Sequence, residues 1–152
     1  AKDPENHADV SLLDIRRPAI FESGGGGLAA TTMDYARFCA MLMGNGRLGE
    51  TRLLGRKTLE LMASDHLGSV SGPPDLLPPG HGFGLGFAVR TSAGMAPFPG
   101  SVGNYYWSGA AGTSFWIDPV ERLFAVLMIQ APVQREYYRV LFRDMVYAAV
   151  TD

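Results

Sequence analysis

The segment from Tyr105 to Pro119 has the residue types best suited to chemistry. Its centre, Gly109 to Gly112, reads Gly-Ala-Ala-Gly and lies between two predicted strands rich in aromatic residues. Small side chains leave backbone N–H groups accessible, and an N–H directed at an incoming oxygen is what an oxyanion hole requires. A glycine-rich hairpin turn flanked by packing aromatic residues would have the same sequence. The segment therefore leaves a catalytic and a purely structural interpretation open.

No motif that activates a nucleophile occurs in the sequence. Gly-x-Ser-x-Gly, which marks a nucleophile elbow, is missing. Ser-x-x-Lys is missing too, because Leu54 stands three residues before Lys57. There is also no Tyr-x-Asn or Ser-x-Asn triplet. Since covalent catalysis needs a nucleophile beside a base, the chain taken alone contains no convincing activated nucleophile.

Metal and phosphate chemistry are not favoured by the sequence. His7, His66 and His81 are widely separated, and the single cysteine, Cys39, lies on the apolar face of a predicted helix. The glycine run Gly24–Gly27 is not followed by the Lys-Ser or Lys-Thr of a P-loop. We therefore expect neither a metal nor a cofactor, and one cysteine cannot form an internal disulfide.

Composition narrows the class of protein. The chain has 152 residues, 47% apolar and 18% charged, which predicts one folded domain or a piece of a larger one. Its net charge of −2 argues against nucleic acid as a partner. The longest apolar run, Leu123–Ile129, is too short to span a bilayer. No signal-peptide pattern is present, so the compartment stays undetermined, with the cytoplasm favoured over secretion.

The first half of the chain is predicted to be helical and rich in loops. Residues 1–22 read as an irregular lead-in without periodicity. Thr31 followed three residues later by Asp34 resembles a capping box and predicts a helix over residues 33–43. The later elements predicted here are a turn-rich segment or short hairpin at 47–54, a helix at 56–62 and a long loop at 68–82.

The second half is predicted to form strands. Large and small residues alternate from Phe83 to Arg90, which predicts one strand with a bare face that another backbone approaches closely. Further strands are predicted at 102–108, 114–118 and 123–130. Because the last of these is apolar throughout, we expect it to be central and covered on both faces.

A closing helix is predicted from residue 133 or 134 to residue 150. Its apolar stripe, centred on Tyr137, Leu141 and Met145, should pack on the sheet. The arginines at positions 135, 139 and 143 should then face solvent. Two helices, about four antiparallel strands and a helix predict an α+β fold, an antiparallel sheet with flanking helices.

Four segments in this order resemble the C-terminal part of the serine β-lactamase and penicillin-binding-protein superfamily. The resemblance is greatest to the class C-like esterases called family VIII carboxylesterases. The matching segments are Gly26–Phe38, Arg52–Leu59, Gly82–Phe87 and Trp107–Pro119. The resemblance implies that residues 23–152 form the C-terminal portion of a β-lactamase/transpeptidase-like fold.

The resemblance also assigns roles to residues. In this superfamily the serine of Ser-x-x-Lys is acylated, a tyrosine assists as base, and a third motif lies on an edge strand beside the site. That motif is Lys-Thr-Gly in many β-lactamases and often begins with Trp in the esterase branch, so Trp107-Ser108-Gly109 matches it. Carried over, Trp107, Ser108 and Gly109 would bind substrate, and the Ala110 N–H would be one oxyanion-hole donor. The second donor would be the N–H of the nucleophile.

The first two motifs of the superfamily are missing from this sequence. We therefore expect a fragment, a cleavage product or half of a split protein that is inactive alone. It would need its N-terminal portion or another chain to complete the sheet.

The expected substrate is a small-molecule ester or β-lactam, cleaved through an acyl-enzyme. Trp107 in place of lysine favours neutral esters, because the lysine cation could bind a β-lactam carboxylate. The alternatives are a non-catalytic binding module that retains the fold, and a self-contained α+β domain whose motifs match by chance.

Overall fold

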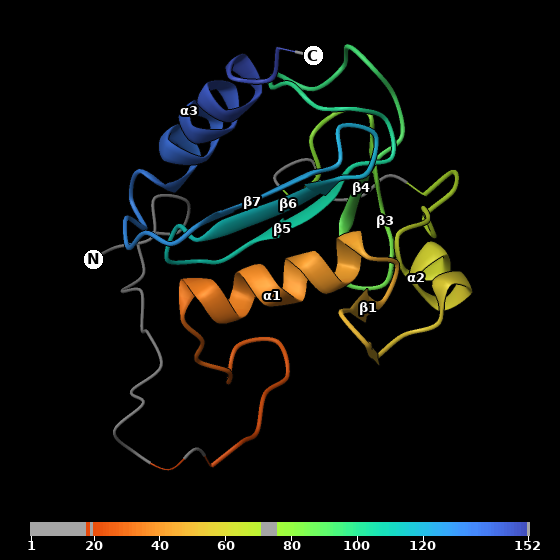
Figure 1. Cartoon of the computed structure of the whole chain (residues 1–152). Helices are drawn as coiled ribbons and strands as arrows, with labels where there is room; N and C mark the ends of the chain where they lie inside the picture. The colour runs from red at the N-terminus through yellow and green to blue at the C-terminus, as the bar shows by residue number, and fades with distance from the viewer. Residues whose placement is uncertain (1–17, 19, 71–75, 152) are drawn as a thin grey trace.

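Figure 1 shows the computed structural model, which describes residues 18, 20–70 and 76–151. The elements are α1 (Thr32–Met43), β1 (Arg47–Leu48), β2 (Thr51–Arg52), α2 (Arg56–Met62), β3 (His81–Phe83), β4 (Ala88–Arg90), β5 (Tyr105–Ser108), β6 (Ser114–Asp118), β7 (Leu123–Leu127) and α3 (Arg135–Ala148). Strands β3 to β7 form one antiparallel sheet in sequence order, and β1 pairs with β2 separately. Helix α1 lies on one face of the sheet and α3 on the other (Figure 1). The α+β prediction is confirmed; most of the expected lead-in lies outside the described residues.

Helix α1 begins at the predicted capping box. The Asp34 N–H donates to the Thr31 hydroxyl at 3.2 Å, and the Asp34 carboxylate accepts the Thr31 N–H at 3.2 Å. The helix ends where Asn45 and Gly46 take positive φ angles of 54° and 85°. Helix α1 ends at the predicted residue and starts one residue before the predicted one, and the short hairpin and helix α2 that follow it are as predicted.

The apolar core lies between helices α1 and α2 and the face of the sheet that α1 covers. The α1 side chains contribute Cys39 and Leu42, which are 0% and 1% exposed. The other buried members are Met41, Leu59, Phe87, Val89, Tyr105, Phe115 and Ile117. This core fixes the central strands β5 and β6, and so the backbone of the Trp-Ser-Gly motif.

The single strand predicted from Phe83 to Arg90 is wrong, because the segment is a hairpin. Strand β3 starts at residue 81, and Phe83 pairs with Ala88 of β4 across a turn. The turn is closed by the Gly84 N–H, which donates to the Phe87 carbonyl at 2.7 Å, and Gly86 adopts a φ of 96°. The expected close approach of another backbone is found at Gly84, where a Cβ would lie closer than 3.0 Å to the backbone of α2, but not at Gly86, which has nothing within 4 Å.

Strand β7 does not occupy the central position predicted for it. It is the last strand of the five-stranded sheet and pairs only with β6 among the described residues. The strand is apolar because helices cover both of its faces, α1 on one side of the sheet and α3 on the other, and not because it is central. Coverage of both faces thus occurs here at a sheet edge. Two strand lengths were also overestimated, because β5 starts at Tyr105 and β7 ends at Leu127.

Helix α3 faces the opposite way from the prediction. Arg135 and Arg143 are 9% and 5% exposed, whereas Tyr137 and Met145 are both 65% exposed. The surface beneath the helix explains this reversal, because it offers backbone carbonyls, an amide and aromatic rings rather than aliphatic side chains. A guanidinium can donate five hydrogen bonds and stack on aromatic rings, so the arginines bind this surface.

Candidate active site

The Trp-Ser-Gly motif lies where β5 extends beyond its neighbour β4. Strand β4 pairs only with Tyr105 and Tyr106 of β5, while β6 pairs with all four residues of the strand. One side of β5 is therefore open along Trp107 and Ser108. The resemblance implies an edge strand for the third motif, and this expectation is wrong, because β5 lies between β4 and β6 and only its last two residues lack a β4 partner.

Trp107 and Ser108 project to opposite faces of the sheet. The Trp107 ring packs against the core and meets Phe83 edge-to-face at 5.1 Å between ring centroids. The Ser108 hydroxyl lies 3.3 Å from the hydroxyl of Ser114 on β6. Within the described part of the chain, this bond is the one seen at the two hydroxyls, and it involves no basic side chain. This contact alone does not activate Ser108 as a nucleophile, because a hydroxyl is not a base.

A tight turn follows the motif. The Gly109 N–H donates to the Thr113 carbonyl at 2.9 Å, and the Gly112 N–H donates to the Gly109 carbonyl at 3.0 Å. A Cβ on Gly109 would lie closer than 3.0 Å to the Thr113 hydroxyl, and Gly112 has a φ of 114°. Glycine is therefore required for this turn at both positions. Ala110 is exposed, and no acceptor for its N–H exists among the described residues.

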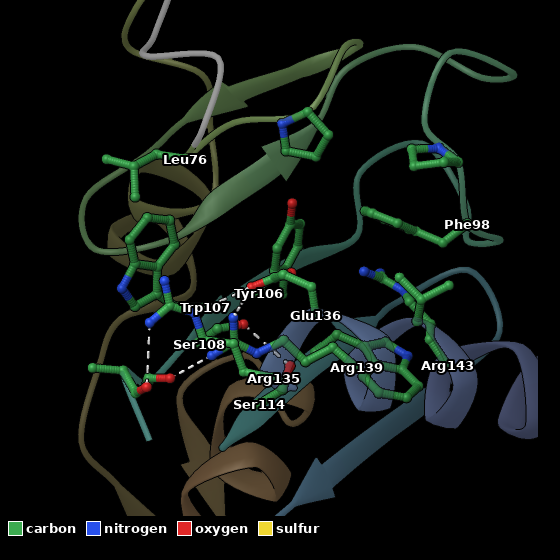
Figure 2. A pocket seen from close by; sticks show the side chains of 16 residues that line it. Leu76, Phe98, Tyr106, Trp107, Ser108, Ser114, Arg135, Glu136, Arg139 and Arg143 are labelled. Carbon is green, nitrogen blue, oxygen red and sulfur yellow. Dashed lines mark hydrogen bonds and ion pairs between the residues drawn. The ribbon is translucent and has the colours of Figure 1, made fainter. Parts of the chain in front are cut away.

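A cavity of about 570 Å³ borders the motif and the turn. Its volume lies in the range of about 300–1,000 Å³ typical of small-molecule sites. Figure 2 shows that side chains of β5, of the loop that carries Phe98 and of α3 line this cavity, with Phe98 beside Arg143. Its lining includes Leu76, Pro78, Phe98, Tyr106, Trp107, Ser108, Gly109, Ala110, Ser114, Trp116, Arg135, Glu136, Arg139 and Arg143. All four predicted site residues thus border one cavity.

Two arginines of α3 bind the turn after the motif. Arg139 donates to the carbonyls of Gly109 and Thr113, and it forms an ion pair with Glu136. Arg135 donates to the Ala110 carbonyl at 3.4 Å. Sequence reasoning missed both residues, although their spacing of four was the available signal. It assigned the charged row to solvent, because the polar surface under the helix could not be foreseen.

The third arginine of the row has a different environment. Arg143 donates to the Asn104 side-chain oxygen at 3.0 Å. Its guanidinium carbon lies 4.5 Å from the ring centroid of Phe98 and 5.0 Å from that of Tyr106. Burial lowers the pKa of Arg143 from its ordinary value. These contacts attach α3 to β5 and to the loop that forms one wall of the cavity.

The tyrosine in the cavity does not provide a base at neutral pH. Burial raises the pKa of Tyr106 to about 12, so its hydroxyl is protonated. Burial likewise raises the pKa of the Cys39 thiol to about 12, which leaves that thiol neutral inside the core.

No group of three or more potential metal ligands occurs among the described residues. In the same part of the chain, no helix has the length and hydrophobicity needed to cross a bilayer.

The fold and the sequence together define a β-lactamase-like protein. The chain belongs to the Beta-lactamase family, which it matches over residues 1–149. Protein Rv1367c of Mycobacterium tuberculosis, strain ATCC 25618 / H37Rv, is 38% identical over 122 residues, which cover 74% of this chain and 30% of that protein. An uncharacterized protein, MT1414, of M. tuberculosis strain CDC 1551 / Oshkosh matches to the same extent.

Solved structures agree with this family. EstCE1, described as a hydrolase with promiscuous acyltransferase activity, superposes with a TM-score of 0.60 and 31% identity over 70% of this chain and 27% of its own. Simvastatin synthase (LovD) from Aspergillus terreus has the same fold, with a TM-score of 0.56 and 21% identity over 78% of this chain and 34% of its own. The chain therefore spans about a third or less of these proteins and 30% of its curated relatives.

Proposed function

We propose that this chain is the C-terminal part of a serine hydrolase that cleaves carboxylic esters through an acyl-enzyme. Trp107, Ser108 and Gly109 would line the acyl site, and the Ala110 N–H would be one oxyanion-hole donor. The observation that carries the proposal is the Ala110 N–H, which has no acceptor among the described residues and belongs to an exposed residue that borders a cavity of about 570 Å³ at the unpaired end of β5. The similarity to EstCE1, a hydrolase, supports it.

In the proposed reaction a serine from outside the 152 residues attacks the ester carbonyl carbon and gives its proton to a base. The carbonyl oxygen then carries the negative charge that the Ala110 N–H stabilises. Collapse of the tetrahedral intermediate expels the alcohol, which takes up a proton. Water then hydrolyses the acyl-enzyme and regenerates the serine.

A neutral ester is the proposed substrate class. The aromatic side chains of Phe98, Tyr106 and Trp107 offer apolar surface to an acyl or alcohol group. The cations of Arg135 and Arg139 also border the cavity, but each bonds turn carbonyls and pairs with Glu136. We assign these cations to the turn rather than to a substrate carboxylate.

A second chain segment would complete the sheet. The outer edge of β7 has no strand partner among the described residues, and unpaired edge strands readily accept another strand. We propose that this segment comes from the N-terminal portion of a longer polypeptide, here called the parent protein. The share of 30% that the chain covers in its curated relatives supports this view.

Hydrolysis of a short-chain p-nitrophenyl ester tests the proposal. The parent protein should release p-nitrophenol, and the 152-residue chain at high concentration should release none above background. A chromogenic cephalosporin assayed in parallel reports any β-lactam hydrolysis. Turnover by the 152-residue chain that is abolished by Ser108→Ala would make Ser108 the nucleophile and overturn the assigned roles.

A non-catalytic binding module is the second candidate function. It is favoured by one observation, the lack of a base beside the Ser108 and Ser114 hydroxyls among the described residues. A fluorophosphonate probe separates the two candidates, because it reacts covalently only with an activated serine. Labelling of the parent protein supports the hydrolase. An unlabelled parent protein that still binds an uncleaved ester supports the binding module.

A further inference from the structure

Arg139 joins α3 to the turn that follows the Trp-Ser-Gly motif, thirty residues earlier in the chain. One nitrogen of its guanidinium donates to the Gly109 carbonyl and, at 3.3 Å, to the Thr113 carbonyl. The two carbonyls belong to the residues that close the turn, since the Gly109 N–H also donates to Thr113. The Arg139 side chain is only 14% exposed, so these bonds form in a partly dehydrated setting.

The Gly109 carbonyl and the Ala110 N–H belong to the same peptide group. In a trans peptide these two groups point in opposite directions across a rigid plane. A guanidinium that holds the carbonyl on one side therefore directs the Ala110 N–H to the other side. The Gly112 N–H donates to the same carbonyl at 3.0 Å and reinforces this orientation.

Two further carbonyls of the turn, those of Ala110 and Ala111, are also engaged. Ala110 accepts from Arg135 at 3.4 Å, and Ala111 accepts from the Ala131 N–H at 2.8 Å. Within the described residues, the N–H groups of Ala110 and Ala111 have no acceptor. Four carbonyls of the turn, those of Gly109, Ala110, Ala111 and Thr113, thus have donors from the protein, while these two N–H groups are available to another molecule.

A cation bonded to a carbonyl also changes the peptide electronically. Charge-assisted hydrogen bonds are about twice as strong as neutral ones. Hydrogen bonds in a chain polarise one another, so a cation on the Gly109 oxygen makes the Ala110 N–H a better donor. The stabilisation that the oriented and polarised Ala110 N–H gives increases as negative charge develops on a substrate oxygen near it.

We propose that Arg139 is a positioning residue that orients and polarises the Gly109–Ala110 peptide for oxyanion stabilisation. This inference rests on the proposed hydrolase function. Arg139 touches no reacting atom in this scheme and acts only through the peptide. Its loss should therefore affect the transition state more than substrate binding.

Steady-state kinetics of the parent protein test the proposal, with Arg139→Ala, Arg139→Lys and Arg52→Ala compared with the unchanged protein. Arg52 is a matched control, because it also donates to two loop carbonyls, those of Asn45 and Leu54, each at 3.1 Å. We expect Arg139→Ala to lower kcat by about 10- to 100-fold. This loss is no larger than the loss of about 100- to 1,000-fold that follows removal of a whole oxyanion donor. KM should change by less than about threefold, because ground-state binding is retained.

Two further readouts separate positioning from general stabilisation. The affinity for a phosphonate that mimics the tetrahedral intermediate should fall in parallel with kcat in Arg139→Ala and recover in part in Arg139→Lys. Arg52→Ala should lower the melting temperature without changing kcat. A variant Arg139→Ala that loses stability but keeps kcat and phosphonate affinity would overturn the proposal. If Arg139→Ala does not fold, Arg139→Lys supplies the same comparison.

An amide measurement keeps this inference distinct from the proposed function. In protein labelled with ¹⁵N-alanine, the Ala110 amide resonance should shift in Arg139→Ala and stay unchanged in Arg52→Ala. If the unchanged parent protein hydrolyses no ester, the hydrolase proposal fails while the amide shift still tests the orientation by Arg139. An unshifted Ala110 resonance would overturn the role of Arg139 even in an active enzyme.

Discussion

Adding a methyl group at Gly109 should disturb the turn through one identifiable neighbour, Thr113. The added Cβ would lie closer than 3.0 Å to the Thr113 hydroxyl, whereas ordinary contacts begin at 3.4 Å, and the next atom, the Thr113 Cβ, is 3.7 Å away. Threonine has three staggered χ1 positions, and two of them direct a heavy atom at any given neighbour. Relief by rotation therefore requires the single orientation that turns a hydrogen toward residue 109.

The expected cost of Gly109→Ala follows from this geometry. Overpacking a tight site costs about 1–3 kcal/mol, so the free energy of unfolding should fall by that amount. Thr113→Ala removes the obstructing hydroxyl and methyl group, and the double variant should regain at least about 1 kcal/mol relative to the sum of the single variants. Urea denaturation of the four proteins in a double-mutant cycle measures this coupling.

A coupling energy below about 0.5 kcal/mol would refute the reasoning, because residues that clash cannot be additive. The same cycle in the parent protein should show kcat falling with Gly109→Ala, since a displaced turn misdirects the Ala110 N–H. A kcat that is unchanged while stability falls would mean that the N–H at residue 110 stabilises no oxyanion.

Three further predictions concern the surrounding fold. Burial raises the Asp118 pKa, but hydrogen bonds from Tyr147 at 2.6 Å and from backbone N–H groups outweigh it and hold the pKa below its ordinary value. The stability that Asp118 contributes is therefore present above about pH 4 and is lost as the pH falls through the lowered pKa. Removing the Tyr147 hydroxyl by Tyr147→Phe should lower the free energy of unfolding by about 1–2 kcal/mol at pH 7 and by less at pH 3, as measured by urea titration. Gly84→Ala should lower the free energy of unfolding by about 1–3 kcal/mol in the same assay, because the added Cβ would meet the α2 backbone. The control Gly24→Ala should lower it by less than about 0.5 kcal/mol, because a Cβ there meets nothing within 4 Å. Met145→Gln should change stability by less than about 0.5 kcal/mol because Met145 is 65% exposed, and a loss above about 2 kcal/mol would mean that the apolar face of α3 is packed.

Features that depend on a few neighbouring residues could be predicted from the sequence. The capping box of Thr31 and Asp34 is local, and it positioned the start of α1 correctly. Strand β6 also has the predicted bounds, Ser114–Asp118, because a turn signal ends it. The hairpin of β3 and β4 was missed because Gly84–Phe87 continues the alternation of large and small residues through the turn. Periodicity alone does not distinguish a strand from two strands that share one pattern.

The orientation of α3 could not be predicted, because it depends on the surface that the helix covers. An amphipathic pattern indicates two faces, and an apolar partner was assumed for the apolar one. The partner surface instead carries the Asn104 side chain, the aromatic rings around Arg143 and the carbonyls of the turn. Aliphatic side chains would have left those carbonyls without donors in a partly buried setting, which costs about 1–3 kcal/mol for each group.

In the candidate site too, local features could be predicted from the sequence and contacts from distant residues could not. Trp107 to Ala110 could be found from sequence, because their small and aromatic residue types are contiguous and match a family motif. Arg135 and Arg139 bond the Ala110 and Gly109 carbonyls of this turn, and these contacts exist only after α3 has folded over the sheet. An N–H can stabilise an oxyanion strongly only if its direction is set before the charge develops. In the function proposed above, the motif would supply the donor, and the distant Arg139 would preorganise it through the Gly109 carbonyl.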